Sequence, residues 1–276
     1  MSDPYELRIE RGANARGYWR DLWSRRNLVT DMAWRDISVR YKQTYLGLAW
    51  TIVTPIVSML VFTLLFHRLA KLGSEGGAPY PVMVFAGLIP WQLFSQALTG
   101  VSTSMVGSAA LVERVYFPRL AIPLKAVIVA GFNTMIALVL LGVLMLAYGF
   151  APSWHVVFLP LFLLLAALTA LGIGLWVAVL NVRYRDFQYL VPYLLQMAMY
   201  ISPVGFKTSV VPDELRFAYS LNPMVGVIDG ARWSLLGGNT PLDLTALGIS
   251  AAFVLLAVAG GLWFFRRSEG TFADRI

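Results

Sequence analysis

Six long runs of apolar residues, separated by short polar segments, dominate the chain. The hydrocarbon core of a bilayer is about 30 Å thick, which a helix of about 20 apolar residues can cross. The fifth run is the shortest and contains Pro192 and Pro203, so its ends are the least defined. The pattern predicts an all-α integral membrane protein with six transmembrane helices, at residues 45–66, 82–106, 122–150, 154–180, 187–204 and 242–265.

Composition supports a membrane location. Hydrophobic residues make up 58% of the 276 residues and charged residues only 13%, whereas a soluble domain carries about 25% charged residues. The net charge of +7 could suggest a nucleic-acid partner, but no nucleic-acid-binding motif is present. The basic residues stand in the short segments between apolar runs, which is how membrane topology is encoded.

The distribution of lysine and arginine predicts the orientation. The N-terminal segment, the second and fourth connections and the C-terminal tail together hold 17 of the 22 basic residues. Basic residues concentrate on the cytoplasmic side of membrane proteins. We therefore expect a multi-pass protein of the bacterial cytoplasmic membrane with both termini in the cytoplasm. This divides the chain into an N-terminal segment (1–44), a transmembrane domain (45–265) and a cytoplasmic tail (266–276).

Two amphipathic helices are predicted before the first span. Trp19, Leu22 and Trp23 share one face, as in helices that lie in the membrane interface. A second helix is expected from an Asn27 cap to Lys42, with one apolar stripe and with acidic and basic residues spaced for ion pairs. This segment could be a membrane anchor with a solvated helix, or a docking surface for a cytoplasmic partner.

The connection at about residues 205–241 has features of two short helices. Pro212 followed by acidic residues indicates one helix start, and Asn222 followed by Pro223 indicates another. Each helix is too short to cross the bilayer. We expect a re-entrant or interfacial hairpin before the last span, with an ordinary extracellular loop as the alternative.

Small residues recur every four positions in the fourth predicted span, at Ala166, Ala170, Gly174 and Ala178. Such a stripe lets helix backbones approach closely. It predicts helix packing, either within the chain or between two copies.

Catalytic and cofactor-binding patterns are absent from the sequence. Apart from Lys125 near one end, the predicted span cores contain no ionisable side chain, and the acidic residues show no pairing suited to acid–base catalysis. His67 and His155 lack neighbouring metal ligands, and there is no cysteine. The phosphate-binding motif G-x-x-x-x-G-K-[ST] is also absent. We expect no enzyme activity and no cofactor in this chain, so energy must come from another subunit. The amphipathic segment 107–118 is the best candidate to receive it, with an ordinary capped loop as the alternative.

Several motifs resemble the membrane subunit of type-2 ATP-binding-cassette (ABC) exporters, specifically those for lipid-linked polysaccharides such as O-antigen, capsule and teichoic acid. The resemblance covers almost the whole chain, and its first motif is the most specific. The motifs are RDISVRYKQTYLGLAW at 35–50 followed by Pro55, GLIPW at 87–91, VYFP at 115–118, NVRYRD at 181–186, Ser202-Pro203 and LNP at 221–223.

This resemblance implies a homodimer of six-span subunits in membrane lipid that carries two cytoplasmic ATPase subunits, which bind the ATP and Mg²⁺. By analogy, the helix before the first span and the helix near Phe117 contact the ATPase, and the hairpin forms an outward gate. The residues implied for ATPase coupling are Asp36, Arg40, Glu113, Arg114 and Phe117, and those for the gate are Pro212, Asn222 and Pro223.

Aromatic side chains suit a path for a sugar polymer, because their faces pack against the apolar faces of sugar rings without imposing charge. The candidates on spans expected near the path are Trp50, Trp91, Phe94, Tyr193, Tyr200 and Phe206. The same residues could instead form an interfacial aromatic belt.

Three other functions remain open from the sequence. One is an exporter of drugs, lipids or haem with a similar architecture. Another is a membrane enzyme that acts on lipid-linked sugars, and the third is a carrier driven by an ion gradient.

Overall fold

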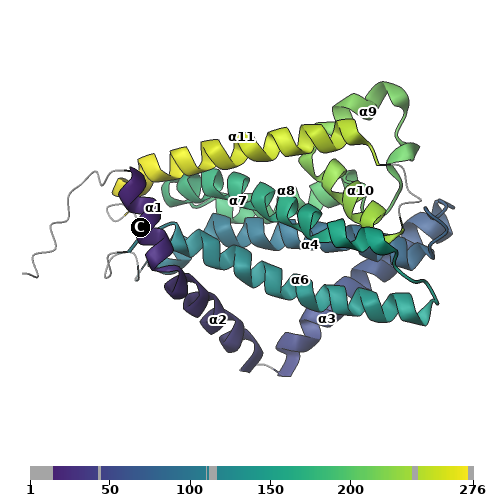
Figure 1. The fold of residues 1–276 in the computed structure, drawn as a ribbon, viewed down its shortest axis with the longest axis horizontal. Helices are drawn as coiled ribbons and strands as arrows, with labels where there is room; N and C mark the ends of the chain where they lie inside the picture. The colour runs from purple at the N-terminus through teal and green to yellow at the C-terminus, as the bar shows by residue number, and fades with distance from the viewer. Residues whose placement is uncertain (1–14, 43–44, 110, 112–116, 238–241, 273–276) are drawn as a thin grey trace, which may run out of the picture.

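The computed structural model describes residues 15–42, 45–109, 111, 117–237 and 242–272, and every regular element in these ranges is helical. The molecule is elongated, as Figure 1 shows. Helix α1, the start of α2 and the C-terminal end of α11 lie at one end, and helices α9 and α10 lie toward the other. The expectation of an all-α protein is confirmed.

Five helices are long and apolar enough to cross a membrane in the described part of the chain. The first is α3 (Tyr45–Phe62), which continues as a π-helical segment at Thr63–Leu69. The others are α4 (Tyr80–Thr103), α6 (Ala121–Ala147), α7 (Leu159–Arg183) and α11 (Leu244–Ser268). A short 3₁₀ segment, Trp154–Phe158, leads into α7.

The predicted fifth span corresponds to α8 (Phe187–Ile201), which has 15 residues. A helix of this length extends about 22 Å, less than the thickness of a bilayer core. It ends before Ser202, whose backbone N–H donates to the carbonyl of Ala198. A six-span topology therefore stays a prediction.

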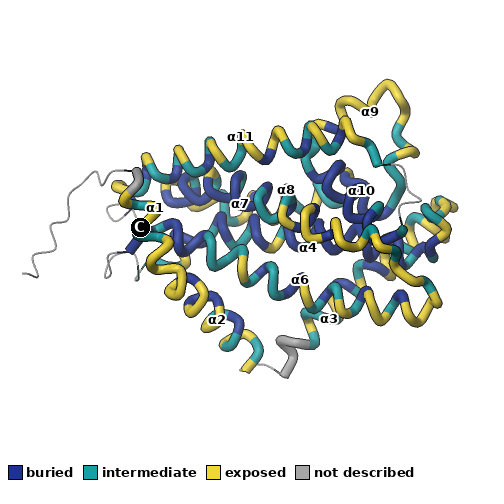
Figure 2. Tube along the Cα trace, viewed as in Figure 1, coloured by how far each residue is buried: buried dark blue, intermediate teal, exposed yellow. Residues whose placement is uncertain are grey.

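Helix α4 lies at the centre of the packing. It contacts α6 on one side and α7 on the other, and α7 in turn packs against α11. Figure 2 shows α4 mostly buried, whereas α3 and α11 expose apolar side chains along their length. Such apolar exposure fits surfaces covered by lipid or by another subunit.

The small-residue stripe of α7 packs within the chain. Ala166, Ala170, Gly174 and Ala178 are all buried. A Cβ atom on Gly174 would stand 2.6 Å from Cγ1 of Val101 on α4, so glycine is required for this approach. Of the two possibilities that the stripe left open, the structure shows packing within one chain at this position.

The two N-terminal helices are α1 (Ala15–Ser24) and α2 (Arg26–Lys42). The expected apolar stripe of α2 is confirmed, because Val29, Ala33 and Ile37 are buried, and α2 packs against α6. The expected cap is wrong. The helix begins at Arg26, and Asn27 lies in its first turn, where its carbonyl accepts a hydrogen bond from Thr30 Oγ1.

Helices α9 (Asp213–Ser220) and α10 (Pro223–Leu235) lie where two helix starts were predicted. Pro212 precedes α9, and Asn222 caps α10 by accepting a hydrogen bond from the backbone N–H of Met224 at 3.0 Å. The chain leaves α10 through Gly237, whose φ of 91° suits glycine. The two predicted helix starts are confirmed.

Candidate functional site

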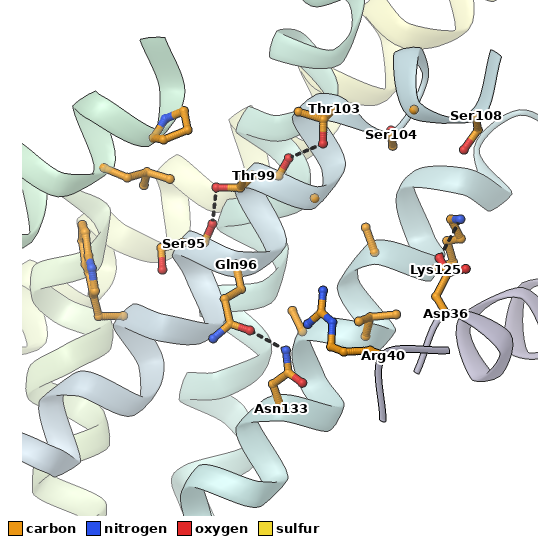
Figure 3. Close-up of a pocket in the computed structure, with 18 of the residues that line it drawn as sticks. Asp36, Arg40, Ser95, Gln96, Thr99, Thr103, Ser104, Ser108, Lys125 and Asn133 are labelled. Carbon is orange, nitrogen blue, oxygen red and sulfur yellow. Dashed lines mark hydrogen bonds and ion pairs between the residues drawn. The ribbon is translucent and has the colours of Figure 1, made fainter. Parts of the chain in front are cut away.

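A groove of about 710 Å³ runs between α2, α4, α6 and α8. The middle of one wall comes from α4, and the opposite side comes from α6 and α2 (Figure 3). Helix α8 contributes Pro192, Leu195, Gln196 and Met199. Membrane segments rarely carry polar side chains without a functional reason, so this groove is the main candidate site.

The α4 wall of the groove carries polar side chains at helical spacing. Ser95, Thr99 and Thr103 follow one another at four-residue intervals, so they lie on one face of the helix. Thr99 Oγ1 donates to the carbonyl of Ser95 at 2.8 Å, and Thr103 Oγ1 donates to that of Thr99 at 2.9 Å. Because each hydroxyl hydrogen is used within the helix, each oxygen presents its lone pairs as acceptors.

A chain of amide hydrogen bonds joins α2, α6 and α4 beside this wall. Tyr41 on α2 donates its hydroxyl hydrogen to Asn133 Oδ1 on α6 at 2.9 Å. Asn133 Nδ2 in turn donates to Gln96 Oε1 on α4 at 2.6 Å (Figure 3). Since the Gln96 carbonyl accepts from Asn133, its exposed side chain keeps two N–H donors for another partner. The wall therefore offers acceptors from hydroxyls and donors from one amide.

Charged residues line one end of the groove. Lys125 on α6 forms an ion pair with Asp36 on α2 at 2.8 Å, and only 13% of the Lys125 side chain is exposed. Arg40, one turn further along α2, is exposed and lines the same groove. Among the described residues that line the groove, these three are the charged ones.

The family of the chain follows from its sequence. The model of the ABC-2 type transporter family matches residues 28–236, from α2 to the end of α10. The chain belongs to the ABC-2 type transporter family. This confirms the family expected from the motifs, and with five apolar helices it establishes a multi-pass membrane subunit.

Three known proteins are similar over most of their length. The O-antigen export system permease protein RfbA of Myxococcus xanthus is 31% identical over 260 residues, which cover 93% of this chain and 98% of the relative. The protein of the same name from Klebsiella pneumoniae is 26% identical, with 87% and 91% covered. The polysialic acid transport protein KpsM of Escherichia coli is 27% identical, with 85% and 91% covered.

Two of the expected coupling residues of this ABC-2 subunit, Asp36 and Arg40, line the groove. Phe117 is buried in an apolar cluster with Leu120, Phe265 and Phe272. Glu113 and Arg114 lie outside the described residues. The coupling role of all five stays a prediction.

The cluster around Phe117 also holds α1 in place. The backbone N–H of Leu120 donates to Tyr18 Oη at 3.3 Å, and the Arg266 guanidinium lies 4.3 Å from the centre of the Tyr18 ring. Burial raises the pKa of the Tyr18 hydroxyl well above its ordinary value, so this side chain is uncharged at neutral pH. The N-terminal helix, the start of α6 and the end of α11 therefore form one packed unit in this ABC-2 subunit.

The six aromatic residues expected along a path do not gather in one place. Trp91 lines the groove and packs against Phe94, with ring centres 5.4 Å apart. Trp50 and Tyr193 are 63% and 59% exposed and are not part of the groove lining. The remaining two join a separate aromatic cluster, in which Tyr200 stacks on Phe62 and Phe206 contacts Phe66.

The expected gate residues lie at the opposite end from α2, near a residue that the sequence reasoning did not single out. Arg232 of α10 is only 1% exposed. Its guanidinium donates to the carbonyl of Val204 at 2.6 Å and to that of Phe206 at 2.9 Å, which fixes the turn after α8. Asn222 Nδ2 donates to Ser202 Oγ at 3.0 Å and secures the same turn. In the sequence, the available sign of this buried contact was a single arginine within a short apolar helix.

The polar groove residues were also missed. The signal in the sequence was the four-residue spacing of Ser95, Thr99 and Thr103 in an otherwise apolar span. Gln96 and Asn133 could not be paired from the sequence, because they lie on different helices.

Proposed function

We propose that this chain is the channel-forming permease subunit of an ABC exporter for a lipid-linked polysaccharide, such as an O-antigen, a capsular polysaccharide or a teichoic acid. Relatives named for O-antigen export and for polysialic acid transport support this assignment, because the similarity extends over nearly the whole chain. Transport would be driven by a separate ATPase subunit. The sequence contains no G-x-x-x-x-G-K-[ST] motif for ATP binding of that kind.

The hydrogen-bonding character of the groove is the observation that carries the proposal. Sugar hydroxyls both donate and accept hydrogen bonds. The Thr99 and Thr103 oxygens are available as acceptors, and the Gln96 amide supplies donors. A polyhydroxylated chain satisfies both groups, whereas an apolar drug or an acyl chain would leave them unpaired at a cost of about 1–3 kcal/mol for each fully buried group.

The assembly that we propose is a homodimer with two ATPase subunits, which hold the ATP and Mg²⁺. Membership of the ABC-2 family supports an ATPase partner. The exposed apolar faces of α3 and α8 are available for lipid and for the second copy. In this arrangement α1 and α2 lie at the cytoplasmic membrane surface, where the ATPase would act.

The topology that we propose has six spans and two cytoplasmic termini. The basic residues at the ends of the chain support this orientation. Helix α8 would serve as the fifth span, with the turn after Ile201 completing the crossing. Helices α9 and α10 would form a re-entrant gate on the outer side, where α10 is buried against α4, α7 and α11.

Removal of the groove hydroxyls tests the function. The double variant Thr99→Val/Thr103→Val keeps the side-chain shape and removes two acceptors. At about 0.5–1.5 kcal/mol per hydrogen bond, surface polysaccharide exported by living cells should fall roughly tenfold. Thr134→Val is the matched control, because Thr134 makes the same bond to a carbonyl four residues back and does not line the groove.

Unchanged polysaccharide export in the double variant, with the chain present at normal levels in the membrane, would count against the proposal. If the ATPase activity of the assembled transporter responded to small amphiphiles and not to polysaccharide, the result would favour the alternative function, a drug or lipid exporter. Turnover of a lipid-linked sugar by the purified chain alone would indicate the enzyme.

A further inference from the structure

Two glutamine side chains line the groove, Gln96 on α4 and Gln196 on α8. In the part of the chain that the structure describes, a hydrogen bond orients the amide of Gln96, and none is found for that of Gln196. Holding an exposed glutamine in one orientation costs side-chain entropy, and a ligand that meets an amide already in place binds without that cost. The contacts that orient Gln96 therefore affect what the groove binds.

We propose that Asn133 and Tyr41 are positioning residues that turn the Gln96 amide hydrogens toward the glycan, and that Gln96 and Thr99 form a subsite for two adjacent hydroxyl groups of one sugar unit. This inference rests on the proposed function and names the part of the sugar chain that the groove recognises. Gln96 and Thr99 would contact the sugar, whereas Asn133 and Tyr41 act through Gln96.

The direction of this chain of hydrogen bonds is set at Tyr41. Its hydroxyl has one hydrogen to donate. The bond to Asn133 Oδ1 is 2.9 Å long, whereas Thr51 Oγ1 lies farther away at 3.4 Å. Because the Asn133 carbonyl accepts from α2, its Nδ2 points to α4, where an acceptor is required. Gln96 Oε1 is that acceptor at 2.6 Å, which leaves the Gln96 Nε2 hydrogens for the groove.

Asn133 is held firmly enough to transmit this direction. It is only 7% exposed, and a buried amide keeps its hydrogen-bond partners because an unpaired group is costly there. The Tyr41 ring packs against Phe132, the residue before Asn133, with ring centres 5.7 Å apart. A half-turn of the Asn133 amide would bring its carbonyl against that of Gln96. The two amides therefore reverse only together, and only if Tyr41 gives up its hydrogen bond to Asn133.

The acceptor of the subsite lies beside this donor. Thr99 follows Gln96 by three residues on α4, so their Cβ atoms are about 5–6 Å apart on the same side of the helix. The Thr99 hydroxyl hydrogen is used by the carbonyl of Ser95, which leaves the oxygen to accept. One sugar hydroxyl can donate to Thr99 while its neighbour on the ring accepts from Gln96. A sugar unit with two adjacent free hydroxyl groups matches this pair.

Export at a controlled substrate supply separates binding from folding. In living cells that carry the complete transporter, inducible synthesis of the lipid-linked polysaccharide sets the supply, which is measured as lipid-linked glycan in the cytoplasmic membrane. The rate at which polysaccharide reaches the surface is divided by the amount of the chain in the membrane. This gives a maximal rate and a half-saturating supply. Loss of a subsite contact raises the half-saturating supply, whereas misfolding lowers the amount of the chain or its maximal rate.

We expect Gln96→Leu to raise the half-saturating supply about fivefold, the factor that corresponds to one hydrogen bond of about 1 kcal/mol. Asn133→Leu should raise it about threefold, because the Gln96 amide must then be ordered when the sugar binds. Tyr41→Phe is the milder variant and should raise it about twofold, since the bond between Asn133 and Gln96 remains. In the Gln96→Leu background neither change should raise it further, because both act through Gln96.

Two matched controls should leave the half-saturating supply unchanged. Gln92→Leu removes an amide one turn earlier on α4, and Thr134→Val changes the residue that follows Asn133 on α6. Neither Gln92 nor Thr134 lines the groove.

An unchanged half-saturating supply in Gln96→Leu would overturn the subsite. A further rise when Asn133→Leu or Tyr41→Phe is added to Gln96→Leu would overturn the positioning role, because a purely structural contact acts independently of Gln96. If these variants match the controls while Thr99→Val/Thr103→Val lowers export, the subsite is removed and the proposed function stands. If that double variant also exports normally, the proposed function fails with it.

Discussion

Asn133 connects α2 to α4 through a single amide, so its replacement by leucine should loosen both contacts at once. The variant Asn133→Leu keeps a similar side-chain volume and removes the hydrogen bonds from Tyr41 at 2.9 Å and to Gln96 at 2.6 Å. Each is worth about 0.5–1.5 kcal/mol net. We expect the free energy of unfolding to fall by about 1–3 kcal/mol.

A double-mutant cycle with Tyr41→Phe isolates one of these contacts. Tyr41→Phe alone removes the donor to Asn133 and should cost about 1 kcal/mol. In Asn133→Leu the acceptor is already gone, and the contact of the Tyr41 hydroxyl with Thr51 Oγ1 is long at 3.4 Å, so adding Tyr41→Phe should cost little more. The resulting coupling energy of about 1 kcal/mol exceeds the roughly 0.3–0.5 kcal/mol of deviation seen between independent sites.

Unfolding by sodium dodecyl sulfate in mixed micelles, followed by tryptophan fluorescence, gives the four free energies. The matched control pairs Tyr41→Phe with Thr134→Val, because Thr134 follows Asn133 on α6 and bonds only within its own helix in the described contacts. That cycle should be additive. Additive costs for Tyr41→Phe and Asn133→Leu would refute the hydrogen-bond chain and leave α2 attached by its apolar face and by the ion pair between Asp36 and Lys125.

Three other predictions concern packing, capping and coupling. Gly174→Ala should lower stability by about 1–3 kcal/mol, because the added Cβ meets Val101 at 2.6 Å; Val101→Ala in the same chain should restore most of the loss in the same unfolding assay. Asn222→Ala removes the cap of α10 and should lower stability by about 1 kcal/mol or more, measured in the same way, with Asn222→Asp retaining most of it. Reversal of both charges at Glu113 and Arg114, which lie outside the described residues, should reduce polysaccharide export without reducing the amount of the chain in the membrane; normal export would remove this segment from the coupling mechanism.

The sequence was most informative about single helices. Long apolar runs and local caps depend on neighbouring residues, so α4, α6, α7 and α11 appear close to the predicted ranges. Asn222 and Gly237 likewise act on the backbone within a few residues of themselves. The error at Asn27 has the same local origin, since a residue suited to a cap also fits the first turn.

The groove could not be predicted in the same way, because its members come from four helices. A hydropathy pattern tolerates serine and threonine within a span, since their hydroxyls can bond to the helix backbone. Thr99 and Thr103 do this, so they leave no mark on the apolar run. The four-residue spacing was visible, but its meaning depends on which helix lies opposite, and that is a property of the tertiary packing.

Arg232 shows why charge counting along the sequence has a limit. By position it belongs to an outward connection, where it would be read as one more exposed cation. In the structure it is buried, and its guanidinium bonds to two carbonyls in the turn that follows α8. Those carbonyls come after the end of a short helix, where the backbone has no helical partner and bilayer lipid offers none. An arginine can satisfy two of them from one side chain, which lysine cannot do with the same geometry. The burial of a charge here therefore follows from the backbone carbonyls that it satisfies.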